Sequence, residues 1–457
     1  MKNMEIVKIS DIKPASYNPR LISSEAFEEL QGSLKTLGFI LPIIVNKDNM
    51  TIVAGHQRTK AAIKVGITEV PAYFVKDISL TNEIAFNQVH NGIESEPKTL
   101  GTFKGNLDAG FHEDIPNSLF EIPEHLTSFT KDICLLINNF GDALCAIVCG
   151  NEVLFGNNYI KACQCLDVPV HVSVLPPEKK ELFCYYFSQD YGVFNYEHIK
   201  REDFVQGLAQ MTNKTIEHSR IYQIALPFIK GEDRKDLKIL DFGCGKAFSI
   251  SYIRKELNYK NAIGIEFFNH NRKGIAVEKG QEMITNLINF VQKKGKFDYV
   301  ICDSVLNSVN SQEAENAVLE ALMLFCKTGG KIFFCGRTKD SVDFIEKQKK
   351  NTADRGYSAR FLDENGLTAK LRNGQWYYQK FHTKEDVDKI IKKLNLEVVA
   401  RKEVPGMWYV GGVKTKELTD EEYLHGIDFE FNMTLPNDQR YGRHNDVRKL
   451  FGYPEKC

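Results

Sequence analysis

Several features that define common protein classes are absent from this sequence. No stretch approaches the roughly 18 consecutive apolar residues of a membrane helix, and the N-terminus MKNMEIVKIS has no apolar signal core. Lys and Arg number 59 against 60 Asp and Glu, so the net charge of -1 offers no general attraction for a polyanion. We therefore expect a cytoplasmic protein, bacterial or phage-encoded, without a membrane partner. Any contact with nucleic acid must come from local basic patches.

Cysteine patterns typical of disulfide frameworks or zinc sites are also missing. The 11 cysteines occur only from Cys134 onward, and none lies in a CxxC pair or in a Cys/His array with zinc spacing. The simple interpretation is reduced thiols and no metal site. With 457 residues, of which 43% are hydrophobic, the chain is long enough for two or three domains with cores of their own, which excludes a disordered adaptor.

Residues 1–97 alternate between helix and strand signals. After YNPR (17–20), apolar residues on one helical face predict a helix that begins at Ser24 as N-cap and ends at Gly38. Two β-rich runs follow, and the second leads through Gly55 into an alanine-rich helix. A glycine before a helix that carries Arg58 can present N–H groups and positive charge to phosphate. Otherwise Gly55 only turns the chain and Arg58 caps a surface helix.

This unit resembles the ParB/sulfiredoxin-like domain family in the order and spacing of its segments. The segments are YNPR, SLKTLGF, PIIV, IVAGHQRTKAA and EVP, and NEIAFNQVHN (82–91) resembles the tail of such modules. The resemblance implies an α+β domain whose strand-to-helix box binds the phosphates of a nucleoside triphosphate. The residues it implies are Gly55, His56, Gln57 and Arg58, with Asn18 and Arg20 nearby. A module that only serves as a scaffold is the alternative.

The box also departs from well-known members of that family. It lacks the cysteine of sulfiredoxin and the second arginine of partitioning ParB proteins, and no helix-turn-helix pattern follows it. Chromosome partitioning is therefore not expected. The GHQR form is similar to ParB-like modules that accompany DNA methyltransferases and other mobile-element proteins, and it is compatible with a homodimer.

Residues 98–197 repeat the pattern of the first unit in a weaker form. CAIVCGNEVLFGNNYIKACQCLDVPVHVSVL aligns with the strand–glycine–helix–strand segment before it, with Gly156 at the place of Gly55 and Pro169 at that of Pro71, after a shortening of three residues. Tyr159 stands where the first unit has Arg58, so the positive charge is lost. We interpret this unit as a degenerate ParB-like repeat; an unrelated α/β linker domain is the alternative.

Residues 198–457 contain a second chemical motif, LKILDFGCGK. A buried strand runs into a glycine-rich turn, where glycines let the backbone pass close to a ligand and Asp241 at the strand tip accepts hydrogen bonds. This pattern alone also suits NAD. A second strand places Glu266 one β-α unit later, where an acid can bind ribose hydroxyls, and FDYVICDS places Asp303 at the tip of a third strand.

The whole set resembles class I methyltransferases that use S-adenosylmethionine (SAM), with a Rossmann-like α/β sheet. The cofactor residues that the resemblance implies are Asp241, Phe242, Gly243, Cys244, Gly245, Glu266, Phe267 and Asp303. The chain between the Glu266 and Asp303 strands reads mostly as helix. The usual third strand is therefore short or missing, and no residue is assigned to contact adenine through it. A fold that retains the cofactor without turnover is the alternative.

The acceptor side matches none of the standard boxes of DNA-base methyltransferases. DSVLNSV (303–309) replaces the D/N/S-P-P-Y/F box, and no Pro-Cys nucleophile is present. The candidate catalytic residues are Asp303, Ser304 and Asn307, which orient an acceptor by hydrogen bonds, since methyl transfer depends mainly on alignment and proximity. The alternative is that Asn307 caps the following helix and Ser304 only makes a turn.

Two later segments combine basic and aromatic residues, as nucleic-acid contacts do. A β-hairpin insertion is expected from the turns ENG and RNG. Its set is Arg360, Lys370, Arg372, Trp376, Tyr377, Tyr378 and Lys380, and that of the tail is Arg440, Tyr441, Arg443, His444, Arg448, Lys449 and Phe451. The packed face of a hairpin and a solvated helix end are the ordinary alternatives.

The sequence as a whole favours a SAM-dependent methyltransferase that acts on nucleic acid, with DNA as the expected partner, and a ParB-like module for nucleotide-dependent binding. The association of the modules, not the chemistry of the acceptor loop, carries the DNA assignment. A methyltransferase for a protein or small molecule is one alternative. A non-catalytic, nucleotide-gated DNA-binding or defence factor is the other.

Overall fold

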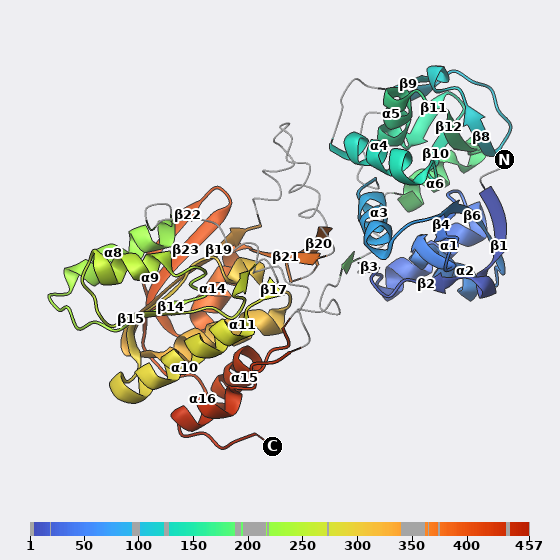
Figure 1. Cartoon of the computed structure of the whole chain (residues 1–457). Helices are drawn as coiled ribbons and strands as arrows, with labels where there is room; N and C mark the ends of the chain where they lie inside the picture. The colour runs from blue at the N-terminus through green and yellow to red at the C-terminus, as the bar shows by residue number, and fades with distance from the viewer. Residues whose placement is uncertain are drawn as a thin grey trace. The chain divides into compact units, whose positions relative to one another are not determined.

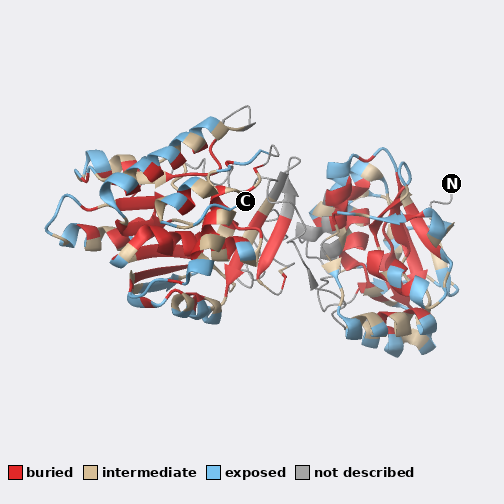
Figure 2. Cartoon of the chain, turned by 90° about the horizontal axis from the view of Figure 1, so that it is seen from below, coloured by how far each residue is buried: buried red, intermediate tan, exposed pale blue. Residues whose placement is uncertain are grey.

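The structure is a computed structural model of the chain, which divides into two compact units, residues 1–195 with 349–361 and residues 196–348 with 362–457. It describes residues 4–18, 20–93, 101–122, 128–187, 193–194, 216, 219–271, 274–339, 362–363, 365–372, 375–435 and 439–456. In both units the buried residues concentrate in the strands of the sheets (Figure 2).

The first unit begins with a five-stranded sheet in the order β1-β6-β4-β5-β2 (Figure 1). Its strands are β1 (Met4–Lys8), β2 (Lys13–Pro14), β4 (Ile43–Asn46), β5 (Thr51–Ala54) and β6 (Glu69–Val75), and its helices are α1 (Ser24–Leu37), α2 (His56–Lys64) and α3 (Leu80–Ile93). β4 is parallel to β6 and antiparallel to β5. Alternate strand residues such as Ile43 and Val45 pack with Leu30 and Leu34 of α1 to form one core.

The cap of α1 differs from the sequence expectation by one residue. Ser23 has extended backbone angles, and its hydroxyl accepts a hydrogen bond from the N–H of Ala26 at 3.2 Å. Ser24 is already the first helical residue. The two serine side chains are chemically equivalent. The N-cap is therefore the serine whose backbone remains extended, which is Ser23. Gly38 ends the helix as expected.

Four neighbouring strands of the second sheet repeat the arrangement of the first, β8-β12-β10-β11 corresponding to β1-β6-β4-β5. Its order is β8-β12-β10-β11-β7-β9, from β7 (Gly101–Phe103), β8 (Gly110–Ile115), β9 (Phe120–Glu121), β10 (Ala146–Cys149), β11 (Glu152–Phe155) and β12 (Val170–Val174). The helices are α4 (Ser128–Phe140), α5 (Asn157–Leu166) and α6 (Lys180–Phe187). β10 is parallel to β12 and antiparallel to β11, as β4 is to β6 and β5. A short pair of β3 (Arg20–Leu21) and β13 (Val193–Phe194) completes the unit.

The glycines before the two corresponding helices share one unusual conformation. Gly55 has a φ of 100° and Gly156 a φ of 101°. A Cβ on Gly55 would lie 2.6 Å from Ile43, and one on Gly156 would lie 2.8 Å from Ala146, at the equivalent place in the sheet. Both positions therefore need glycine for the same two reasons, left-handed backbone and close packing.

The strand register corrects one detail of the expected repeat. β4 and β6 align Ala72 with Ile43, and β10 and β12 align Val172 with Ala146. Pro71 therefore corresponds to His171, not to Pro169, and the shortening is one residue instead of three. The pairing partner in the sheet fixes the register, and a proline match does not.

Both sheets of this unit contribute to a single hydrophobic cluster. Ile44, Tyr73 and Val75 of the first sheet lie in it together with Ile147 and Val172 of the second. The boundary at residue 97 and the common origin of the two halves stay predictions. Their packing surfaces, however, are shared.

The second unit has a larger sheet with the path β15-β14-β18-β19-β21-β20, and β23 and β22 extend it from the other side of β19. The strands are β14 (Ile239–Phe242), β15 (Ala262–Ile265), β18 (Phe297–Cys302), β19 (Cys326–Thr338), β20 (Leu367–Arg372), β21 (Gln375–His382), β22 (Leu396–Val404) and β23 (Met407–Lys414). β14, β15, β18 and β19 are parallel, and β23 runs antiparallel to β19. This is the doubly wound α/β class that the sequence predicts.

Helices flank this sheet (Figure 1). They are α8 (Arg220–Gly231), α9 (Phe248–Lys255), α10 (Val277–Lys294), α11 (Gln312–Phe325), α14 (Lys384–Lys393), α15 (Asp420–Phe431) and α16 (His444–Leu450). Only the two-residue strands β16 (His270–Asn271) and β17 (Gly274–Ile275) lie between β15 and α10. In the described part of the chain, β15 is thus the edge of the sheet, and the third strand is missing as expected.

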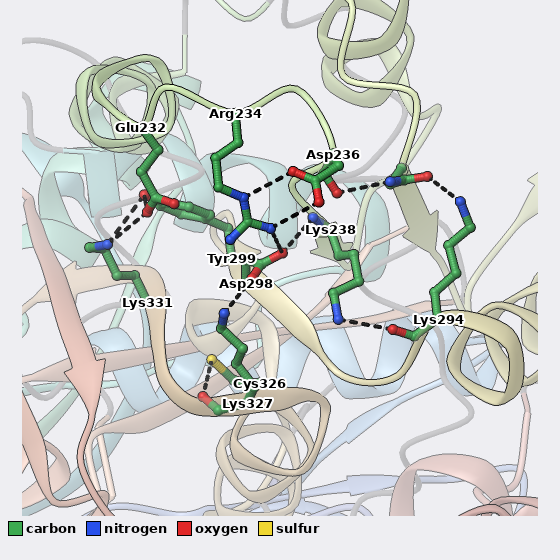
Figure 3. A network of polar contacts seen from close by, with 11 residues as sticks. Glu232, Arg234, Asp236, Lys238, Lys294, Asp298, Tyr299, Cys326, Lys327 and Lys331 are labelled. Atoms are coloured by element: carbon green, nitrogen blue, oxygen red, sulfur yellow. Dashed lines mark hydrogen bonds and ion pairs between the residues drawn. The ribbon is translucent and has the colours of Figure 1, made fainter.

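The N-terminal ends of the parallel strands are fixed by an ionic network (Figure 3). Asp298 accepts a hydrogen bond from the N–H of Lys238 at 2.7 Å and forms an ion pair with Lys327 at 2.5 Å. Burial alone would raise the pKa of Asp298, but these contacts hold it below its usual value. Glu232 binds the hydroxyl of Tyr299 and the ammonium of Lys331. The opposite, C-terminal ends carry the candidate site.

Candidate cofactor and acceptor sites

The glycine-rich turn follows β14 directly and wraps around the end of β15. Gly243 has a φ of 80° and Gly245 a φ of 54°, both in the left-handed region that favours glycine. The N–H groups of Gly243 and Cys244 donate to the carbonyl of Ile265 at 2.9 and 3.0 Å. These bonds hold the turn across the tips of two neighbouring parallel strands, where doubly wound sheets bind ligands.

Asp241 lies under this turn with a carboxyl group that is incompletely satisfied. Its side chain is buried beside the hydroxyl of Tyr222, which is itself buried in α8. Oδ1 of Asp241 has no partner with hydrogen-bond geometry among the described residues. Burial raises the pKa of Asp241 to about 7, the charges of Asp303 and Glu266 add to this, and the Tyr222 hydroxyl acts against it. A buried, acidic acceptor of this kind suits a cationic donor.

Glu266 stands at the end of β15, where the sequence predicts a ribose-binding acid. Its Oε2 accepts from the N–H of Gly245, and its Oε1 from the N–H of Phe268, both at 2.9 Å. The carboxylate is therefore oriented by the glycine turn itself. The two phenylalanines after it, Phe267 and Phe268, are each 4% exposed, and Phe267 packs against Phe242.

Asp303 follows β18 and is held by three short side chains. Its Oδ2 accepts from the hydroxyl of Ser219 at 2.6 Å, and its Oδ1 accepts from that of Ser304 at 2.8 Å and from the thiol of Cys335 at 3.5 Å. Ser304 has a φ of 62°, so the chain turns sharply here. Ser219 lies at the start of α8. The sequence reading missed Ser219 and Tyr222, which are distant along the chain and form no recognisable motif.

Asn307 does not cap the following helix. Ser311 does so, because its hydroxyl accepts from the N–H of Ala314 at 3.0 Å. The amide nitrogen of Asn307 donates to the Ser308 hydroxyl at 3.3 Å, and its Oδ1 is buried without a partner among the described residues. The capping alternative for Asn307 is thus wrong, and its role toward an acceptor stays a prediction.

The hairpin β20–β21 forms as expected, but its basic residue Lys380 is internal. Lys380 is 2% exposed and pairs with Glu315 of α11 at 3.0 Å, and His382 bonds the other oxygen of that carboxylate. Tyr378 is also buried. These contacts contradict the interpretation of Lys380 and Tyr378 as nucleic-acid contacts, because buried charges are paired inside the fold. The side chains of Arg360, Lys370, Arg372 and Trp376 lie outside the described residues.

The basic tail is likewise divided between internal and surface residues. Arg448 forms a two-pronged ion pair with Asp428 and donates to the carbonyl of Pro454, and only 7% of it is exposed. Its expected contact with phosphate is therefore wrong. Arg443 binds Asp446 and α10. Arg440 and Lys449 remain exposed.

The predicted nucleotide box lies beside the YNPR loop, although these segments are distant in sequence. The amide of Gln57 donates to the carbonyl of Arg20 at 2.8 Å, and His56 Nε2 accepts from the N–H of Ala15 at 3.1 Å. Burial lowers the pKa of His56 to about 4, with smaller contributions from Lys60 and His90, so the ring is neutral near pH 7. Asn18 is part of the same loop and half-buried.

Other contacts fix the surroundings of this box. Arg58 donates to the carbonyls of Leu41 and Pro42, which tie the start of α2 to the chain before β4. The buried Glu83 of α3 accepts from the Tyr17 hydroxyl at 2.8 Å and from the Asn46 amide. Sequence reasoning did not single out Glu83.

In the second half of the unit the corresponding place is closed by the protein itself. The hydroxyl of Tyr159, which replaces Arg58, donates to Asp142 at 2.6 Å and accepts from the N–H of His171 at 3.0 Å. At the start of α5, Oδ1 of Asn157 accepts from the N–H of Gly101 at 3.2 Å. The side chains of Tyr159 and Asn157, which stand where a phosphate would bind, therefore already form hydrogen bonds within the protein.

Two further findings concern other kinds of site. Within the described ranges, no group of His, Cys, Asp and Glu is arranged to hold a metal ion. None of the helices that the structure describes has the length and apolar character needed to cross a membrane.

The parallel sheet, the glycine turn and the acids at three strand tips define the second unit as a class I methyltransferase fold. Comparison with known proteins agrees, since residues 216–401 match the family described as methyltransferase domain and residues 1–92 match the ParB N-terminal domain. The chain therefore joins a ParB N-terminal domain to a methyltransferase domain.

Individual relatives cover single parts of the chain. A probable chromosome-partitioning protein ParB of Neisseria meningitidis is 37% identical over 89 residues, and a nucleoid occlusion protein of Bacillus thuringiensis 33% over 94. These stretches are 19% and 20% of this chain, which spans only about a third of each relative, 31% and 32%. The Burkholderia thailandensis 1,6-didemethyltoxoflavin-N1-methyltransferase structure is 11% identical, with a TM-score of 0.27, over 43% of this chain and 77% of that one.

Proposed function

We propose that this protein transfers a methyl group from SAM to DNA, and that its ParB-like domain binds a nucleotide at Gly55–Arg58. The observation that carries the methyltransferase assignment is the convergence of Asp241, Glu266 and Asp303 on the glycine turn at the C-terminal ends of β14, β15 and β18. Three acids around one turn are a poor site for an anion and a good site for a cationic, hydroxyl-rich ligand.

The residues present fit SAM in their charge and in the hydrogen-bond acceptors that they offer. When bound, SAM supplies a methyl group on a positively charged sulfur. The unpartnered Oδ1 of Asp241 offers an acceptor to its ammonium group, and the oriented carboxylate of Glu266 offers acceptors to the ribose hydroxyls. Left-handed glycines at 243 and 245 let the backbone approach the ligand.

On the acceptor side, the chain's own residues supply orientation. Ser219 and Ser304 fix the Asp303 carboxylate, so it is held ready to accept a hydrogen bond from an amine or hydroxyl. Asn307 offers a second acceptor atom, its Oδ1, which has no partner among the described residues. A nucleophile held in line with the methyl group of bound SAM would displace it directly: the carbon–sulfur bond would break as the new bond forms, S-adenosylhomocysteine would leave as a neutral thioether, and the proton of the amine or hydroxyl would pass to solvent. Alignment accounts for much of the rate of such a displacement.

DNA as the acceptor is supported by the presence of a ParB N-terminal domain in the same chain as the methyltransferase domain. The two relatives of the ParB domain are named for chromosome partitioning and nucleoid occlusion, functions that take place on DNA. A small-molecule or protein acceptor is the second candidate. It is favoured by the internal ion pairs of Lys380 and Arg448, which remove basic charge from the surface where phosphates would bind.

Nucleotide binding at the box is supported by three groups that are separated in the sequence and lie close together in the fold. The Gln57–Arg20 hydrogen bond brings the YNPR loop against the start of α2, so that Arg20, Asn18 and the helix N-terminus share one neighbourhood. In this proposal the nucleotide controls how the protein engages DNA.

The deciding experiment incubates the full chain with methyl-labelled SAM and, in separate reactions, DNA, RNA and cell lysate. Label in DNA is expected for the wild type and for Asp236→Asn, an exposed acid at the opposite end of the sheet. It is expected to vanish for Asp241→Ala. Label in protein or small molecules alone would refute the DNA assignment, and SAM binding with no labelled product would refute the enzymatic one.

A further inference from the structure

Among the described residues, no strand of the sheet flanks the side of the cofactor site beside Glu266. In the described part of the chain, β15 is the last strand of the sheet, and only β16 and β17 precede α10. Phe267 is nevertheless 4% exposed. Another part of the fold therefore covers this edge.

The cover comes from residues 420–435 and 439–456, which we name the C-terminal cover. Phe431 at the end of α15 packs edge-on against the ring of Phe267, with 5.4 Å between ring centroids. Tyr441, before α16, lies 6.0 Å from the same ring, and its hydroxyl donates to the carbonyl of Phe267. The segment lies wholly beyond residue 401, where the match to the methyltransferase family ends.

Tyr441 is held in this place from α10. The amide of Gln281 donates to the Tyr441 carbonyl at 2.8 Å, and Arg443 donates to Gln281 at 3.1 Å and to Thr285 at 2.9 Å. Gly280 makes room for the ring, since a Cβ there would lie 2.2 Å from the hydroxyl oxygen. Burial and the charge of Glu266 raise the pKa of Tyr441, so its hydroxyl stays a donor.

We propose that Tyr441 is a positioning residue for the nucleoside end of the cofactor site. In this proposal the C-terminal cover shields and holds the sheet edge beside Glu266, where a further strand would otherwise lie. The hydroxyl fixes the carbonyl of Phe267, and the N–H of Phe268 fixes Glu266 at 2.9 Å. The short backbone segment 266–268 is thereby held so that Glu266 faces the glycine turn. The inference rests on the proposed use of SAM.

The test compares Tyr441→Phe with Tyr453→Phe by calorimetric titration of the full chain. Tyr453 belongs to the same cover, and its hydroxyl donates to Asp420 at 3.0 Å, away from Phe267. The two variants therefore lose the same chemical group. The ligands are S-adenosylhomocysteine and 5′-methylthioadenosine, which share the nucleoside and differ in the amino-acid part.

Tyr441→Phe leaves a buried carbonyl without its donor and is expected to weaken both ligands about tenfold, while Tyr453→Phe stays within about twofold of wild type. Gln281→Ala, a milder change, is expected to weaken both about threefold if Tyr441→Phe proves unstable. Unchanged affinity in both Tyr441→Phe and Gln281→Ala, or loss for S-adenosylhomocysteine alone, would overturn the inference. A wild type that binds neither ligand would instead refute the proposed cofactor.

Discussion

Asp241→Asn is expected to stabilise the ligand-free methyltransferase unit while it weakens cofactor binding. The carboxyl group is buried and its pKa rises to about 7 from 3.8. Because the folded protein then holds a proton that the unfolded chain has lost, stability decreases as pH rises from about 4 to about 7, and the loss is complete above pH 7. The difference between these pKa values corresponds to about 4 kcal/mol.

Asparagine keeps the shape but carries no charge, so the variant escapes this penalty. We expect it to gain up to about 4 kcal/mol at pH 8 and about half of that at pH 5.5, the gain tending to zero near pH 4. Both tryptophans of the chain, Trp376 and Trp408, belong to the second unit, and Trp408 is 1% exposed. Urea unfolding followed by tryptophan fluorescence therefore reports on this unit separately.

The comparison needs the wild type, Asp241→Asn and the exposed control Asp236→Asn at pH 5.5 and 8. The control is expected to leave the unfolding free energy unchanged at either pH, because the ion pair of Asp236 with Arg234 is exposed to solvent. An Asp241→Asn protein that is no more stable than wild type at pH 8, or whose gain is the same at both values, would refute the electrostatic reasoning. The same variant is expected to lose affinity for S-adenosylhomocysteine, since a neutral amide no longer attracts the ammonium group.

Further expectations follow from single contacts. Glu266→Gln is expected to weaken S-adenosylhomocysteine about tenfold or more in calorimetry, because a charge-assisted hydrogen bond becomes a neutral one; equal affinity would remove Glu266 from the site. Lys380→Met leaves the buried Glu315 without its lysine and is expected to lower the free energy of unfolding by about 3 kcal/mol in urea, and a loss below 1 kcal/mol would show that His382 suffices. Arg58→Ala is expected to abolish binding of ribonucleoside triphosphates in equilibrium dialysis, and retained binding would remove this box from the proposal.

Local sequence signals predicted the parts of the fold that local physics controls. The buried strand 239–242 carries its aspartate one residue before its end, and the glycines at 55 and 243 have the left-handed backbone that glycine favours. The expected hairpin also forms, from strands 367–372 and 375–382. The absence of a third strand from the described residues was also predictable, because an 18-residue amphipathic helix fills most of the available chain. These features depend on residues that are close to each other in the sequence.

The roles of individual charged residues were less predictable. Lys380 and Arg448 look like surface cations in the sequence, yet Lys380 of strand β21 is buried against Glu315 of α11, and Arg448 of α16 against Asp428 of α15. The first pair joins residues 65 positions apart, and no local pattern marks Glu315 as the partner. Serine and tyrosine residues that orient the strand-tip acids were missed for the same reason, since Ser219 reaches Asp303 across 84 positions.

The sequence by itself determined that a strand-tip acid, a glycine turn and a second acid recur at the spacing of a SAM-binding sheet, because such spacing is set by the lengths of a strand and a helix. It also determined that a strand–glycine–helix box stands at the N-terminus. Only the tertiary structure decided what surrounds these groups. Contacts between distant segments determine which carboxyl oxygen lacks a partner among the described residues, which lysine is internal, and that Tyr441 covers the edge beside Glu266. Burial then fixes the energy of each charge.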